Sequence, residues 1–155
     1  MERSPREGPA GGTDVSPSLE EARAELNSRC DAIEECYEFM LAYAGQGLDS
    51  DSGSSTGSQV REFLRKCDGA LAGLAEFIGR FVQQANVDSM APYTAFLGVI
   101  DRDARDAQAA VRLVLAQPSI SSQLVDNLNA SIHLRALLTD LFLIDEVFKG
   151  HRGPA

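Results

Sequence analysis

The cysteines are the first residues of this sequence whose type and spacing could do chemistry. Cys30 and Cys36 fall in one predicted helix, and Cys67 falls in the next. If the two helices pair antiparallel, counting inward from their connection puts Cys36 roughly level with Cys67, close enough for a disulfide or a soft-metal pair. This spacing makes Cys36 and Cys67 a candidate redox pair. The alternative is that each cysteine is a small buried hydrophobe.

A second candidate is His133 in the last predicted helix. The segment 129–139 resembles the phospho-acceptor helix of histidine kinases and of phosphotransfer bundles, a resemblance that implies a phosphate acceptor role for His133. It departs from the kinase pattern at Leu134, Ala136 and Leu138, which stand where an acid, an arginine and a proline are found. A phosphotransfer bundle would also have lysine and glycine at positions 136 and 137. The alternative is a solvent-facing histidine with no special role.

Other catalytic and cofactor patterns are absent from the sequence. Di-metal carboxylate bundles need a glutamate three residues before a histidine, and neither His133 nor His151 has one. There is no Cys-x-x-Cys-His for covalent haem, no Gly-x-Ser-x-Gly for a nucleophile, and no glycine-rich phosphate loop after a strand. We therefore expect a protein that is not an enzyme and that holds no metal and no cofactor.

The charge balance disfavours two classes of partner. A formal net charge of −9 repels phosphate backbones and anionic lipid headgroups, so we expect neither nucleic-acid nor membrane binding. Arg61, Arg65 and Lys66 form a small basic cluster, interpreted as a solvated face because Glu62 lies among them. An N-terminus without an apolar signal core and an odd number of cysteines favour a cytoplasmic location.

Two stretches lack hydrophobic periodicity. Residues 1–17 are rich in glycine, proline, serine and charge, and they are expected to be a disordered tail. Residues 45–57 are expected to be a flexible loop between two helices. The remaining chain, 18–150, has the length of one domain, and with 44% hydrophobic residues it can bury a core.

Apolar residues in this domain recur at spacings of three and four, which predicts four long helices. Ser18 opens the first helix with a capping box, Gly45 ends it, and Pro92 suits the first turn of the third. The second helix contains Gly69, Gly73 and Gly79, which either permit close helix contact or are simply tolerated. Long helices with short later connections predict an all-α, antiparallel up-down-up-down four-helix bundle. The expected ranges are about 18–45, 58–88, 88–118 and 119–150.

The last predicted helix is apolar on more than one side. One stripe runs through its whole length from Ile120 to Val147, and a second is confined to its C-terminal half. A single buried face needs only one stripe, so the second is predicted to be an interface. The alternative is that neighbouring helices cover both stripes. The predicted interface residues are Leu134, Leu137, Leu141, Ile144 and Phe148.

These features favour a non-catalytic protein–protein interaction module: an acidic accessory, adaptor or regulatory protein. Its partner would be another protein or a second copy of the chain, since burying several such side chains contributes enough for a stable dimer. A thiol-based redox sensor using Cys36 and Cys67 is one alternative. A histidine phosphotransfer-like module using His133 is the other.

Overall fold

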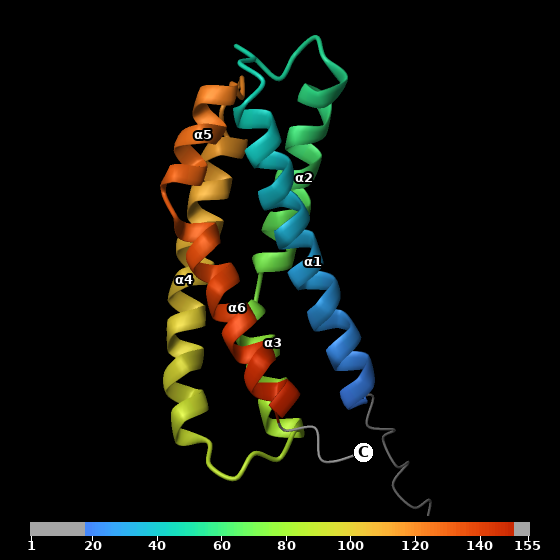
Figure 1. Ribbon diagram of the computed structural model, residues 1–155, viewed down its shortest axis with the longest axis vertical. Helices are drawn as coiled ribbons and strands as arrows, with labels where there is room; N and C mark the ends of the chain where they lie inside the picture. Colours follow the sequence, from blue (N-terminus) through green and yellow to red (C-terminus); the bar gives the residue numbers. More distant parts are fainter. Residues whose placement is uncertain (1–17, 151–155) are drawn as a thin grey trace, which may run out of the picture.

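The computed structural model describes residues 18–150, and over that range the chain is all-helical (Figure 1). The predicted all-α class is confirmed, but the described residues form six helices rather than four. The predicted tail, residues 1–17, lies outside the described range. The helices are α1 (Leu19–Ala44), α2 (Ser55–Leu71), α3 (Leu74–Gln84), α4 (Ala91–Leu115), α5 (Ser122–Ala130) and α6 (His133–Gly150).

Several helix ends lie where the sequence predicts them. The Ser18 hydroxyl accepts a hydrogen bond from the Glu21 backbone N–H at 3.1 Å and caps α1, which ends before Gly45. Pro92 lies in the first turn of α4. Ser121 caps α5 by accepting from the Leu124 N–H at 3.0 Å. Short polar side chains and glycine therefore set these boundaries locally.

The second predicted helix is interrupted, which corrects the sequence expectation. Gly73 adopts a left-handed backbone with φ of 63°, which glycine reaches without steric cost, and it separates α2 from α3. The Arg29 guanidinium of α1 donates to the Ala72 carbonyl at 2.8 Å, so the carbonyl exposed by the break has a partner. The glycine at position 73 is thus a helix breaker.

The last predicted helix is interrupted as well. Ile132 has φ of 64°, a left-handed conformation that a β-branched residue rarely adopts, and it separates α5 from α6. Its side chain, expected in the continuous apolar stripe, is 51% exposed. A left-handed residue changes the rotation of the following helix, so residues after 132 no longer continue the stripe that begins at Ile120. Within each interrupted pair, α2 with α3 and α5 with α6, the helices follow one another along the molecule (Figure 1).

The core lies between these helices. The largest contacts are those of α1 with α2 and α5, of α4 with α6, and of α4 with α2 and α3. Fully buried side chains recur at the predicted helical spacing on most elements, among them Ile33, Leu64, Ile78, Ile100 and Leu137. None of the helices described is long and apolar enough to cross a membrane.

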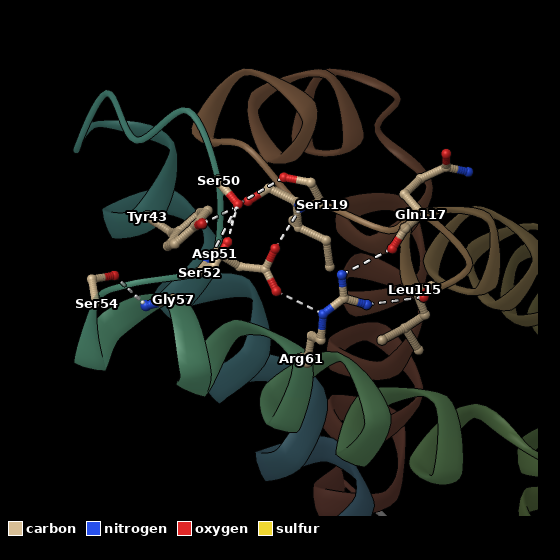
Figure 2. Close-up of polar contacts among 11 residues, drawn as sticks. Tyr43, Ser50, Asp51, Ser52, Ser54, Gly57, Arg61, Leu115, Gln117 and Ser119 are labelled. Atoms are coloured by element: carbon tan, nitrogen blue, oxygen red, sulfur yellow. Dashed lines mark hydrogen bonds and ion pairs between the residues drawn. The ribbon is translucent and has the colours of Figure 1, made fainter.

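One end of the molecule is held by a polar network that we call the loop clamp, made by Tyr43, Asp51, Arg61 and Ser122. Figure 2 shows Tyr43, Asp51 and Arg61 of this network. The Arg61 Nε lies 2.7 Å from the Asp51 Oδ2, and its other nitrogens donate to the carbonyls of Leu115 at 3.1 Å and Gln117 at 2.9 Å. Arg61 therefore does not belong to a solvated face. Its neighbours Arg65 and Lys66 are exposed to solvent.

The remaining contacts of the loop clamp reach Ile120, just before α5, and Ser122, the first residue of α5. Asp51 Oδ1 accepts from the Ile120 N–H at 2.7 Å, and the Tyr43 hydroxyl donates to the Ile120 carbonyl at 2.7 Å. The Ser122 hydroxyl donates to the Tyr43 carbonyl at 2.7 Å and accepts from the Leu48 N–H at 2.9 Å. The stretch expected to be a free linker therefore carries specific contacts, and its last residues, from Ser55, already belong to α2.

Candidate functional site

The five predicted interface residues are not on the surface. All five are at most 4% exposed, because α6 lies between α1 and α4 and both sides of it are covered. Phe148, for example, packs edge-on against Phe81 of α3, with ring centroids 4.9 Å apart. The prediction is therefore corrected: these residues belong to the core of the chain. They are Leu134, Leu137, Leu141, Ile144 and Phe148.

A different set of apolar side chains on α6 faces solvent. Phe142 is 55% exposed, Leu143 54% and Val147 37%. Leu143 and Val147 belong to the stripe that the sequence assigns to the core. The break at Ile132 rotates α6 relative to α5. This rotation explains why Leu143 and Val147 are exposed while the predicted interface residues are buried. We refer to Phe142, Leu143 and Val147 as the α6 face.

Next to the α6 face lies an apolar groove of about 280 Å³ between α4 and α6. We call it the α4–α6 groove. Helix α4 contributes the residues of its first turns and α6 those near its C-terminal end, and every lining side chain is aliphatic or aromatic. The lining residues are Pro92, Tyr93, Phe96, Leu143, Ile144 and Val147.

The carboxyl groups of Asp103 in α4 and Asp140 in α6 lie close enough to interact directly. Burial and the neighbouring Asp103 raise the pKa of Asp140 to about 7. Two carboxyl groups hydrogen-bond to each other only when one keeps a proton, so near neutral pH the pair holds a proton for part of the time. The Asp140 Oδ2 is buried and makes no hydrogen bond with the described residues.

A second cleft, of about 300 Å³, lies between α1 and α6 and contains the half-buried Cys30. Burial, helped by the charges of Glu34, Asp145 and Asp31, raises the pKa of the Cys30 thiol to about 11. A thiol needs to ionise to act as a nucleophile, and this surrounding opposes ionisation. The surroundings of Cys30 therefore disfavour its thiolate form at neutral pH.

The structure brings Cys36 and Cys67 together. Both are fully buried and form no disulfide, and the hydrogen bond that the Cys67 thiol donates to Cys36, together with burial, raises the pKa of Cys67. The helices α1 and α2 therefore place Cys36 next to Cys67, as the expected antiparallel register predicts. Their chemistry is nevertheless that of buried thiols, because neither reaches solvent and ionisation of Cys67 is opposed.

His133 is exposed and is the first residue of α6. Of the polar residues near it in sequence, Asn129 is half-buried, and both polar atoms of its side-chain amide make no hydrogen bond within residues 18–150. Exposure allows phosphate transfer but does not supply it, so this role stays a prediction. No three His, Cys, Asp or Glu side chains of the described range are arranged to hold a metal ion.

The chain matches no protein-family model, no curated protein and no solved structure. Residues 18–150 define an all-helical protein whose surface includes the α6 face and the α4–α6 groove.

Proposed function

We propose that this chain is a non-catalytic protein-interaction module whose docking surface is the α6 face together with the α4–α6 groove. The observation that carries the proposal is the exposure of Leu143 and Val147 in a groove lined by aliphatic and aromatic side chains, with the exposed Phe142 next to Leu143 on α6. Contiguous exposed apolar surface commonly marks a binding site, since soluble proteins otherwise bury it. An accessory, adaptor or regulatory role in the cytoplasm fits such a module and the acidic composition.

The distribution of exposed apolar residues supports this location. Leu19, Leu41 and Leu113 are exposed too, but they lie on separate parts of the helices, and single exposed hydrophobes are ordinary. Met90 is also exposed and lies two residues before Pro92, the first groove residue of α4. We also infer that the helices form a four-helix bundle in which α2–α3 and α5–α6 are two interrupted members.

Site-specific photocrosslinking tests the proposed surface. Benzoylphenylalanine replaces Leu143 in one protein and Leu113 in a matched control, because both side chains are more than half exposed. We expect a discrete protein adduct from position 143 in native extract and none from position 113. An adduct of twice the chain mass would identify a second copy as the partner. Equal labelling from both positions, or no adduct from position 143, would contradict the proposal.

A further inference from the structure

The Asp103–Asp140 pair lies at one end of the α4–α6 groove. Asp140 precedes Leu143 by three residues, about 5 Å along α6, and Asp103 follows Phe96 by two turns, about 10 Å along α4. The two carboxyl groups therefore continue the line of the groove between the same two helices. A helix lying along this groove would reach the carboxyl pair within two turns of its apolar anchors.

None of the nearby basic side chains that the structure describes forms an ion pair with Asp103 or Asp140. On α4, Arg105 is bonded to Asp101 at 3.0 Å, and on α6, Lys149 is bonded to Asp145 at 3.2 Å. Arg102 and Arg135 are exposed, and neither contributes to the pKa shift of Asp140, whose causes are burial and Asp103. No ion pair among residues 18–150 involves either member of the carboxyl pair.

We propose that the α4–α6 groove binds an amphipathic helix of another protein, which places apolar side chains in the groove and one lysine or arginine on Asp103 and Asp140. This inference rests on the proposed function and names the chemistry of its partner. A cation would take the place of the proton shared by the two carboxyl groups and would give the buried Asp140 Oδ2 a donor. Apolar anchors at helical spacing are the usual way in which a groove binds a helix.

Charge complementarity favours this occupant over a second copy of the chain. The formal net charge is −9, so two copies repel each other. The cleft on the α1 side of α6 has mixed charge, since Asp31, Glu34 and Asp145 line it together with Arg23 and Lys149. A basic helix would be attracted to the acidic protein as a whole and to the Asp103–Asp140 pair in particular.

Binding to designed peptides tests the inference. The first probe is an acetylated helical peptide with leucines at i, i+4 and i+7 and arginines flanking them, and the matched probe has glutamine in place of every arginine. Fluorescence anisotropy measures their affinities for the unaltered protein, Asp140→Asn, Leu143→Asp and the surface control Leu113→Asp. Circular dichroism verifies that each variant keeps its helical content.

We expect the arginine peptide to bind roughly fivefold more tightly than the glutamine peptide, and Asp140→Asn to remove most of that preference. The affinity for the arginine peptide should rise between about pH 6 and about pH 8, a range that brackets the pKa of Asp140. The reason is that the carboxyl pair loses its shared proton over this range. Leu143→Asp should abolish binding of both peptides, and Leu113→Asp should change neither.

Two outcomes separate the proposals. If both peptides bind equally and both are lost in Leu143→Asp, the docking surface stands and the basic partner is excluded. If neither peptide binds, or if binding survives Leu143→Asp, the groove is not a helix site, and the inference fails together with this location for the proposed function. A chain that dimerises through Leu143 at micromolar concentration would also overturn the inference in favour of a second copy.

Discussion

Arg61 and Asp51 form a 2.7 Å ion pair that folds the loop between α1 and α2 back onto the start of α2. The same guanidinium bonds the carbonyls of Leu115 and Gln117 at the end of α4. Both side chains are largely buried, with 22% and 13% of their surface exposed, so water does not readily replace these bonds. One arginine therefore connects the loop, α2 and the end of α4.

Arg61→Ala should destabilise the protein. Its removal leaves the Asp51 carboxylate and two carbonyls without their donors, which costs about 2 to 3 kcal/mol of unfolding free energy. Urea denaturation followed by circular dichroism measures the difference. The control is Arg65→Ala, whose side chain is exposed and whose loss should cost less than about 0.5 kcal/mol. Equal effects of the two substitutions would contradict the role of the loop clamp.

Replacing either of two glycines of α2 by alanine should change the stability of the protein, in opposite directions for the two positions. A Cβ at Gly57 would overlap the backbone of Asp51, so Gly57→Ala should destabilise by about 1 to 3 kcal/mol. A Cβ at Gly69 meets nothing within 4 Å, so Gly69→Ala should stabilise by up to about 1 kcal/mol, the helix propensity gain. Thermal melting of both variants checks the pair, and a stable Gly57→Ala protein would show that the loop is not packed there.

Ile132→Gly should stabilise the protein. An isoleucine held at φ of 64° carries a steric cost that glycine does not have, and its half-exposed side chain contributes little to packing. We expect a gain of about 1 kcal/mol in unfolding free energy, measured by urea denaturation. Ile132→Val is the control, since valine keeps the β-branch and should give no gain. A loss of stability in the glycine variant would mean that the left-handed turn is not strained.

Stability should depend on pH through Asp140. Its pKa is raised in the folded protein, so between about pH 4 and pH 7 the folded state holds more protons than the unfolded state. Unfolding free energy should therefore fall as pH rises through this window because of this group. Asp140→Asn should remove that contribution, so the variant gains stability relative to the original protein at pH 8 but not at pH 4. Urea midpoints across this range measure the effect, and parallel profiles would argue against the carboxyl pair.

The thiols should react only after unfolding. Cys36 and Cys67 are fully buried, and burial also raises the pKa of Cys30 to about 11. We expect slow labelling by a thiol reagent at pH 8 in the folded protein and rapid labelling of every cysteine in urea. A Cys36–Cys67 disulfide that forms in the folded protein under mild oxidant would contradict this expectation and would favour the redox-sensor alternative.

The sequence predicts the core of this protein better than its surface. Helical periodicity identifies Ile33, Leu64 and Ile100 as buried, because each lies on an apolar stripe that faces the other helices. For α6, helical periodicity assigns the wrong stripe to the surface. This error has two reasons. Periodicity does not show that α1 and α4 flank α6 on two sides, and no local signal marks Ile132 as the residue that ends α5.

The other features that sequence reasoning missed depend on contacts between distant segments. The break at Gly73 has a partial signal, since glycine is a weak helix former, but Gly69 in the same helix does not break it. The partners of Arg61 are an aspartate in a serine-rich loop and two backbone carbonyls, which no pattern of residue types reveals. The Asp103–Asp140 pair depends on the register of α4 against α6.

The loop clamp also bears on the order in which the chain folds. The Tyr43 hydroxyl and the Ile120 carbonyl are 77 residues apart in sequence, and the Ser122 hydroxyl and the Tyr43 carbonyl are 79 apart. Forming such a contact closes a large loop. The entropy lost in closing it is not offset by favourable contacts until the intervening segments are nearly in place. We therefore expect the hairpin of α1 and α2 to form early and the clamp to close late, so that the residues joining the loop to α5 contribute to the unfolding rate rather than to the folding rate.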